Sequence, residues 1–411
     1  MSSKTTPDVP MNILVLDTIH GGKEIARHLF SLGHTVDCVD VYRGRDGIPV
    51  AEARSRRYDL IAAPVHLDPD HPLMTIEGTP YTTHHEIVAT ILRPLGLGTV
   101  IEITGTRGKT TTAHAIAHGM GGSGILHTST GTYRYPGKET LWKKSITPAS
   151  LINAAEEAAS TGGWLIAEES IGVSGAGDLG ILTSDIDYAI AGGKKSALAE
   201  KTRMLAGCGQ VLLAPGMEEE IPGATPAGEI VSLEGIRCSW NCNGRDGSFE
   251  NPLFAVEGYR VPLMTAAAAL CLLGEDPAAL ATFTALPARM HVQAAEGDTT
   301  IVDNANSGAC LATTCDAVAL ARRHRPGCRL TLVVGAESST VCEGFPFADI
   351  AEVIKNTTPT SVIIVGEQYR SCRTDTLAVM PLAIVATLDE GAALARSTET
   401  DAIVLAVKTW R

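Results

Sequence analysis

The residues best suited to chemistry lie in one short segment, TGTRGKTTT, at residues 104–112. The β-branched run TVIEI precedes it, and a helical pattern follows it. A turn between a strand and a helix N-terminus directs backbone amides and a partial positive charge at phosphate oxygens. Lys109 would contact the β- and γ-phosphates, and the Thr110 hydroxyl would bind Mg²⁺. The segment therefore predicts a nucleoside triphosphate site formed by Gly105, Thr106, Arg107, Gly108, Lys109, Thr110 and Thr111.

The segment departs from the general phosphate-loop pattern GxxxxGK[ST], because Ile103 stands where the first glycine is expected. The alternative interpretation is a structural glycine turn that leaves Lys109 exposed. GK[ST] alone is a weak signal. A strand, this glycine-rich turn and a helix in succession favour the nucleotide site.

Two adjacent carboxylates, Glu168 and Glu169, end the strand-like segment WLIAEES. Because side chains alternate along a strand, only one of the two should face the nucleotide. Phosphoryl transfer to a carboxylate needs a phosphate cradle, Mg²⁺ and positive charge near the transferring group. Lys109, Thr110 and Glu168 have the right chemistry for those tasks. A solvated carboxylate at a strand end is the alternative interpretation of Glu168.

The elements that must position these residues predict an α/β protein with three regions behind a flexible leader at residues 1–10. Residues 11–98 show a β-α-β alternation, which implies parallel strands joined by right-handed crossovers. Residues 99–286 predict a doubly wound parallel sheet of the P-loop ATPase type, with a β extension at 217–258. Residues 287–411 alternate again and predict a C-terminal Rossmann-like domain.

Composition and charge exclude several classes of protein. The chain has 411 residues, of which 45% are hydrophobic and 19% charged, as in globular proteins. Its formal net charge of -13 disfavours nucleic-acid binding, which depends on basic residues at phosphates. No apolar run approaches the ~18 residues of a membrane-spanning helix. The N-terminus lacks the apolar core of a secretory signal, so we expect a cytoplasmic protein whose ten cysteines are reduced thiols.

Four histidines fall within twenty residues: His66, His71, His84 and His85. They are either loop residues or the metal site of a non-catalytic, ATP-dependent metallochaperone or switch. No helical HxxxH spacing supports a metal site, which favours the first interpretation.

The segment TGTRGKTTT resembles the TGTNGKT loop of the Mur ligase family. The resemblance continues along the chain in HTSTGTY, SITPAS, LIAEESIG, LTSDIDY, LPARMHV and IVDNANSG. It implies three domains, namely a small Rossmann-like substrate-binding domain at 11–98, a central ATP-binding domain at 99–286 and a C-terminal α/β domain at 287–411. It also implies an ATP- and Mg²⁺-dependent ligase that converts a carboxylate to an acyl phosphate and couples it to a nucleophile.

The resemblance implies roles for individual residues. Glu168 matches the family's Mg²⁺-binding glutamate, and Lys201 matches its carbamylated lysine, which would make Lys201 an anionic metal ligand. The alternative for Lys201 is an ordinary surface lysine on an acidic-basic helix. Arg289 matches the linker arginine and is either an ATP contact or a surface arginine. Asp303 and Asn306 fall in the segment that contacts the ribose or adenine, with Asn306 replacing a histidine.

Three departures from the family pattern bear on the substrate. Ile186 stands where a histidine is expected, YRVPLM replaces the asparagine motif before the Ala-rich helix, and the chain ends at LAVKTWR without the usual extension. These changes put peptide-precursor substrates in doubt more than they do the use of ATP.

Within the family, the chain resembles members that act on a nickel tetrapyrrole precursor. Those enzymes activate a propionate side chain with ATP, and an adjacent carbon nucleophile then closes a carbocyclic ring. The alternative is an amide-forming ligase that joins an amino acid or peptide amine to a carboxylate. The sequence identifies neither the residues that hold the tetrapyrrole nor the oligomeric state.

Overall fold

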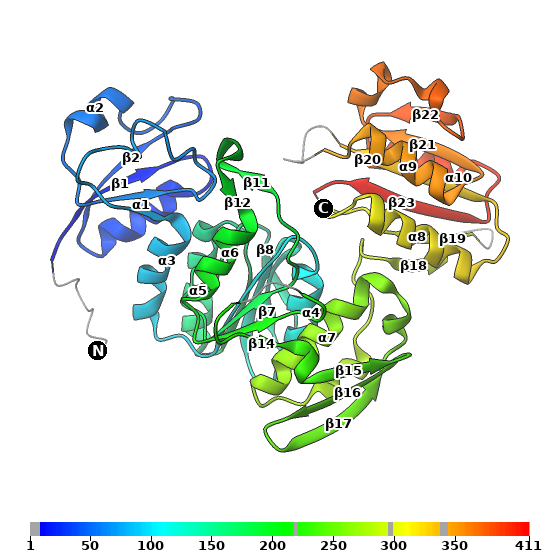
Figure 1. Ribbon diagram of the computed structural model, residues 1–411, viewed down its shortest axis with the longest axis horizontal. Coiled ribbons are helices and arrows are strands. Elements are labelled where there is room, and N and C mark those ends of the chain that lie inside the picture. The colour runs from blue at the N-terminus through cyan, green and yellow to red at the C-terminus, as the bar shows by residue number, and fades with distance from the viewer. Residues whose placement is uncertain (1–8, 218–220, 295–298, 338–343, 411) are drawn as a thin grey trace. The chain divides into compact units, whose positions relative to one another are not determined.

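The described part of the chain is an α/β protein built on three main sheets and two smaller ones, and Figure 1 shows their strands as arrows. The computed structural model describes residues 9–217, 221–294, 299–337 and 344–410. One compact unit comprises the chain up to Glu250 together with Val261–Ala281, and the other comprises Asn251–Arg260 and Thr282–Arg411. The predicted α/β class is confirmed.

The N-terminal sheet has four parallel strands in the order β2-β1-β3-β4. The run NILVL forms the central strand, and four of its five side chains are buried. The strands are β1 (Asn12–Leu16), β2 (Thr35–Val39), β3 (Leu60–Ala63) and β4 (Tyr81–Thr83), and the helices are α1 (Gly22–Ser31), α2 (Val50–Ser55) and α3 (His84–Leu92). The predicted β-α-β unit is therefore present, with β1 between its two partners.

The central sheet has eight strands in the order β14-β13-β10-β5-β9-β6-β7-β8. Strands β5, β6, β9, β10, β13 and β14 are parallel, whereas β7 and β8 form an antiparallel extension. The strands are β5 (Val100–Thr104), β6 (Gly124–Thr128), β7 (Gly131–Tyr135), β8 (Glu139–Trp142), β9 (Trp164–Glu168), β10 (Leu179–Leu182), β13 (Gln210–Leu213) and β14 (Thr225–Pro226). Because parallel strands share a carboxyl edge, the segments after β5, β6, β9 and β10 meet there.

Four helices and two small antiparallel sheets complete this part of the chain. The helices are α4 (Lys109–Gly119), α5 (Pro148–Thr161), α6 (Ala197–Leu205) and α7 (Glu257–Leu272). Strands β11 (Ala189–Ile190) and β12 (Lys195–Ser196) pair before α6. The predicted β extension is a three-stranded sheet of β15 (Val231–Glu234), β16 (Arg237–Cys242) and β17 (Arg245–Glu250).

The C-terminal sheet has six strands in the order β18-β19-β23-β20-β21-β22. Only the edge strand β18 is antiparallel to its neighbour. The elements are β18 (His291–Ala294), β19 (Thr300–Asp303), α8 (Leu311–His324), β20 (Leu330–Ala336), α9 (Phe347–Thr357), β21 (Ser361–Val365), β22 (Pro381–Val385), α10 (Leu388–Arg396) and β23 (Ala402–Lys408). This is the predicted Rossmann-like alternation with an added edge strand.

The N-terminal and central sheets share one hydrophobic core. Buried side chains of β1 and α1, such as Val15 and Ile25, belong to the same cluster as Leu151 and Ile152 of α5. This shared core explains why both sheets fall in the first compact unit. The division of the chain at residues 98 and 286 stays a prediction.

A carboxylate joins the N-terminal region to α6. Glu86 accepts hydrogen bonds from the backbone amide (2.9 Å) and hydroxyl (2.8 Å) of Thr83, forming the capping box of α3. Its other oxygen pairs with Arg203 of α6. Burial by itself raises the pKa of Glu86, but Arg203 and Thr83 outweigh it and hold the pKa at about 2.

Candidate active site

The loop after β5 has a backbone conformation at two positions that favours glycine. Gly105 has φ 136°, and a Cβ there would lie 2.3 Å from Thr183 Oγ1. Gly108 has φ 84° and forms the N-cap of α4, so Lys109 is the first residue of the helix. L-residues with a side chain rarely adopt these values. The glycines therefore shape a strand–loop–helix turn of the kind that binds phosphate groups.

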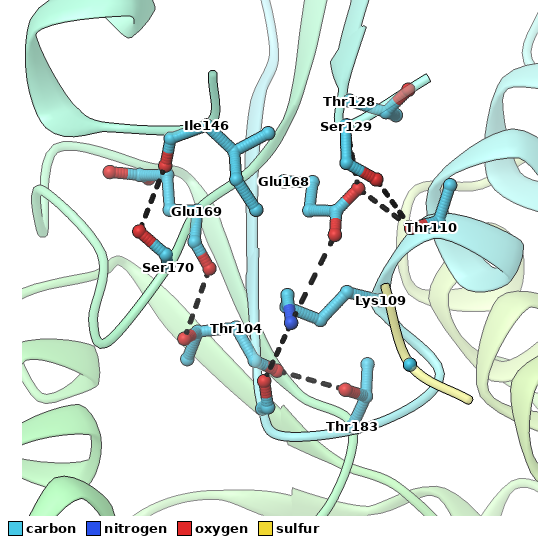
Figure 2. A network of polar contacts seen from close by, with 12 residues as sticks. Thr104, Lys109, Thr110, Thr128, Ser129, Ile146, Glu168, Glu169, Ser170 and Thr183 are labelled. Atoms are coloured by element: carbon cyan, nitrogen blue, oxygen red, sulfur yellow. Dashed lines mark hydrogen bonds and ion pairs between the residues drawn. The ribbon is translucent and has the colours of Figure 1, made fainter. Parts of the chain in front are cut away.

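Lys109, Thr110 and Glu168 come together at the carboxyl edge of the central sheet, as Figure 2 shows. The Thr110 hydroxyl donates to Glu168 Oε2 at 2.8 Å, and Lys109 Nζ lies 3.9 Å from Glu168 Oε1. The backbone amide of Ser129, after β6, also donates to Glu168 Oε2 at 3.0 Å. Lys109 Nζ donates to the Gly105 carbonyl at 2.9 Å. Residues from three strand ends thus form one polar site.

Thr183 and Ser184, which follow β10, hold the glycine loop in place. The Thr183 hydroxyl lies 3.0 Å from the Thr104 carbonyl (Figure 2) and 2.5 Å from the Arg107 carbonyl. Ser184 Oγ accepts the backbone amides of Thr106 (2.8 Å) and Arg107 (3.1 Å). Sequence reasoning assigned both residues to the predicted strand at 178–185 and gave them no role in the site, although the segment LTSDIDY that contains them carries part of the family resemblance.

Lys201 is fully buried, so the interpretation as a surface lysine is wrong. Its Nζ donates to the Thr106 hydroxyl at 3.1 Å and lies 4.8 Å from the centre of the Tyr188 ring. Thr106 in turn donates to the carbonyl of Ile186 at 2.8 Å. The Ile186 side chain is 41% exposed, so the residue at the family's histidine position meets the loop through its backbone.

The two adjacent glutamates have different surroundings, as strand alternation predicts. Glu168 faces Lys109 and Thr110, whereas Glu169 is buried beside Glu102 of β5. Neither carboxyl oxygen of Glu169 has a hydrogen-bond donor. Glu102 accepts the amides of Gly175 (3.0 Å) and Gly177 (3.1 Å). Burial, and next the charge of Glu102, raise the pKa of Glu169 well above its ordinary value.

Three predicted site residues lie in the second compact unit. Arg289 lies between two left-handed residues, Ala288 (φ 58°) and Met290 (φ 52°), and its carbonyl accepts the Tyr259 hydroxyl at 2.7 Å. Asp303 ends β19 and accepts the amide of Ala305 at 3.0 Å.

Asn306 fastens the segment after β19 to the one before β18. Its side-chain amide donates to the carbonyls of Ala288 (2.8 Å) and Asn304 (3.1 Å). The oxygen of the same side chain accepts the amide of Gly308 at 2.8 Å. These bonds give Asn306 a structural task, and its role toward a nucleotide stays a prediction.

The four histidines do not assemble a metal site in the described parts of the chain, where no three His, Cys, Asp or Glu side chains are placed to hold an ion together. His84 and His85 are buried, which lowers the pKa of each to about 4. His85 Nε2 lies 2.9 Å from the Ser170 carbonyl. The cysteines in the described ranges are free thiols. Within those ranges, every helix is too short or too polar to cross a bilayer.

The donor set at Thr110 and Glu168 fits Mg²⁺. A hydroxyl and a carboxylate are hard oxygen ligands, and a protein commonly supplies only one or two ligands to this ion beside substrate phosphates. The two side chains already lie within hydrogen-bonding distance, on neighbouring elements.

Comparison with known proteins supports the family resemblance. Residues 293–409 match the family model described as the C-terminal domain of the coenzyme F430 synthetase CfbE. The chain is 29% identical to the coenzyme F(430) synthetase of Methanosarcina acetivorans over 473 aligned positions, which cover 97% of this chain and 98% of the relative.

Solved structures confirm the fold. The UDP-N-acetylmuramate-alanine ligase MurC of Thermotoga maritima is 14% identical, with a TM-score of 0.54 over 97% of this chain and 95% of its own. FolC of E. coli, solved in complex with DHPP and ADP, is 15% identical, with a TM-score of 0.56 over 80% of this chain and 90% of its own. The chain has the Mur ligase fold, as its motifs predict.

Proposed function

We propose that this chain is an ATP-dependent ligase of coenzyme F(430) biosynthesis in methanogenesis. It phosphorylates a propionate carboxylate of the nickel seco-acid tetrapyrrole precursor, and an adjacent carbon of the same molecule then attacks the acyl phosphate. The observation that carries this proposal is the likeness to a coenzyme F(430) synthetase over 97% of the chain. The strand–loop–helix turn with Lys109, Thr110 and Glu168 supplies the matching chemistry.

The reaction balances without an external oxidant or amine. A carboxylate oxygen attacks the γ-phosphorus of ATP, and ADP leaves. The carbon nucleophile loses a proton and attacks the acyl carbon, and phosphate leaves with the former carboxylate oxygen. One C–C bond forms, and the precursor loses the elements of one water overall.

Each side chain has a task that its position supports. The loop amides and the N-terminus of α4 bind phosphate oxygens, and Lys109 places positive charge beside the transferring group. Thr110 and Glu168 would hold Mg²⁺, which neutralises charge on the phosphates when it is bound. Glu168 also orients Lys109 and Thr110 before any ligand arrives.

The other predicted site residues have proposed tasks as well. A carbamate on Lys201 would replace a buried cation by a buried anion beside Thr106, suited to a further metal contact. Gly105, Thr106, Arg107, Gly108 and Thr111 would line the phosphates. Arg289, Asp303 and Asn306 would contact the nucleotide, as the family resemblance implies.

Mass spectrometry of the precursor tests the proposal. The purified protein is mixed with ATP, Mg²⁺ and the nickel seco-acid, with no amine present. We expect the precursor to lose one water, with ADP and phosphate formed in equal amounts. A precursor that stays unchanged while amino acids or peptides stimulate ATP turnover would replace this proposal with the amide-ligase function. ATP binding without any turnover would favour a switch.

A further inference from the structure

Three rings meet at the carboxyl edge of the N-terminal sheet, and we refer to His20, Tyr42 and His66 as the ring cluster. The His20 ring centre lies 5.4 Å from that of Tyr42 and 5.8 Å from that of His66, in edge-to-face geometry. Tyr42 and His66 stack at 6.1 Å with an interplanar angle of 14°. The three side chains come from the separate loops that follow β1, β2 and β3.

The position of the ring cluster in the sheet is one where ligands bind. Strand β1 lies between β2 and β3, and all three are parallel. The chain therefore leaves β1 toward one side and later crosses to the other, and in open α/β sheets ligands bind at the carboxyl ends of the strands at such a reversal. His20 and His66 follow those two strands.

Asp17 holds His20 in a specific orientation. It is fully buried and has a left-handed backbone, with φ 76°. Its Oδ1 accepts the amides of Ile19 (2.8 Å) and His20 (3.2 Å), while Oδ2 lies 2.7 Å from His20 Nδ1. A carboxylate on one imidazole nitrogen fixes the tautomer and prepares the other nitrogen to bind a metal. The His20 side chain is 49% exposed, so a ligand can reach it.

The surroundings of the ring cluster suit a flat, anionic molecule. Tyr42 is 43% exposed, and the same loop carries the exposed Arg43 and Arg45. Asp40 organises this loop by accepting the amides of Tyr42 (3.1 Å), Arg43 (2.9 Å) and Arg45 (3.1 Å). The stacked rings offer an apolar face, and the arginines offer charge for carboxylates.

Burial lowers the pKa of two histidines near Asp17, namely His66 and His84. Burial, followed by the charge of His20, lowers the pKa of His66. His84 is 3% exposed, its Nε2 has no hydrogen-bond partner, and the charges of Asp17 and His66 both act on it.

The ring cluster is also tied to the candidate active site within the same compact unit. Gly21, next to His20, packs so closely on α5 that a Cβ there would lie 2.3 Å from Ala149 Cβ. Ile146, just before α5, accepts the backbone amide of Ser170 at 3.1 Å, and Ser170 lies two residues beyond Glu168 (Figure 2). A molecule on the ring cluster thus sits on the segment that leads to the phosphoryl-transfer residues.

We propose that the ring cluster is the tetrapyrrole-binding site, with His20 Nε2 as an axial ligand to the substrate's nickel and with Tyr42 and His66 against the macrocycle. This inference rests on the proposed function, which supplies the substrate class. It assigns a single protein ligand, His20, to the nickel of the substrate.

Titration with the nickel seco-acid and with its metal-free counterpart tests the inference. Added axial nitrogen changes the coordination of square-planar nickel, so binding should shift the visible absorption of the nickel compound. His20→Phe should abolish this shift and weaken binding of the nickel compound by about tenfold or more. The same variant should bind the metal-free compound as the unmodified chain does. His34→Phe, at the opposite edge of the same sheet, is the control and should change neither.

If His20→Phe weakens the binding of both compounds equally, His20 does not bind nickel. The same conclusion follows if the variant keeps both the absorption shift and the affinity for the nickel compound. Tyr42→Ala extends the test, because it should weaken the binding of both compounds to the same extent. The ring-closure assay on the unmodified chain separates the two proposals. If the unmodified chain closes the ring and His20→Phe leaves the titration unchanged, this inference alone is overturned. If the unmodified chain neither binds the nickel compound nor turns it over, the proposed function is overturned as well.

Discussion

Lys201 Nζ lies 3.1 Å from the Thr106 hydroxyl, although 95 residues separate the two along the chain. A lysine with no exposed surface thereby reaches the loop expected to bind phosphate. This contact fixes α6 relative to α4 and gives the proposed carbamate a defined place.

Substitution of Lys201 tests that place. Lys201→Met keeps an apolar stem in the buried position but removes the nitrogen, so ring closure should slow by about 10²-fold or more. NMR with isotopically labelled bicarbonate should show a carbamate signal in the unmodified protein and none in the variant. Lys355→Met, on an exposed position of α9, is the control and should keep full turnover. A carbamate signal that remains in Lys201→Met would show that the carbamate forms on another lysine.

Lys109 should act mainly on the chemical step. Lys109→Ala removes the charge beside Glu168 and the transferring phosphate, and we expect turnover to fall by about 10²–10³-fold. Precursor binding, measured by its visible absorption, should stay within about twofold because the ring cluster is untouched. An equal loss of binding and turnover would contradict the assignment of Lys109 to phosphoryl transfer.

Gly105 should tolerate no side chain. Its φ of 136° and the 2.3 Å separation between Thr183 Oγ1 and an added Cβ predict that Gly105→Ala costs about 1–3 kcal/mol of unfolding free energy. Urea unfolding measures this loss. Gly137→Ala is the matched control, because a Cβ there would meet nothing within 4 Å. Similar stabilities for the two variants would show that the loop relaxes around the added methyl group.

The buried Glu169 should make stability depend on pH. Its folded pKa is raised, so its stabilising contribution is complete below the ordinary pKa of about 4.5 and is lost as pH rises toward the folded pKa. In that window the native state binds more protons than the unfolded state, and the loss is about 1.4 kcal/mol per pH unit.

Glu169→Gln should remove that slope, because an amide mimics the protonated carboxyl at every pH. Urea unfolding of both proteins at a series of pH values from acid to neutral provides the measurement. Glu399→Gln, at a side chain that is 91% exposed, should leave the slope unchanged. Parallel pH profiles for Glu169→Gln and the unmodified chain would mean that Glu169 is ionised in the fold.

The phosphate loop could be predicted from sequence because its chemistry is local. A strand, two glycines and Lys109 follow one another within a few residues, and Glu168 ends the apolar run WLIA. The burial of Lys201 could not be predicted, since the charged segment AEKTR looks like a solvent-facing helix and its contacts with Thr106 and Tyr188 form only in the folded chain. The ring cluster escapes sequence reasoning for the same reason: three separate loops contribute one ring each.

Two strands, β7 and β18, could not be predicted because their sequences do not show an apolar strand pattern of their own. Strand β7 starts three residues after β6 ends, so the segment HTSTGTY suggests one strand and a turn, whereas the structure has a hairpin. The edge strand β18 carries the mixed segment HVQA, whose pairing with β19 is visible only in the assembled sheet.

The Glu86 carboxylate both caps α3 and pairs with Arg203, so the two charges of this ion pair cannot be exchanged. Exchanging the two charges, by Glu86→Arg together with Arg203→Glu, would restore an attraction between α3 and α6. It would not restore the start of α3, because a guanidinium cannot accept the Thr83 amide. The acidic partner must therefore stand on α3 and the basic partner on α6, so a swap that is harmless in most surface pairs would unravel a helix end here.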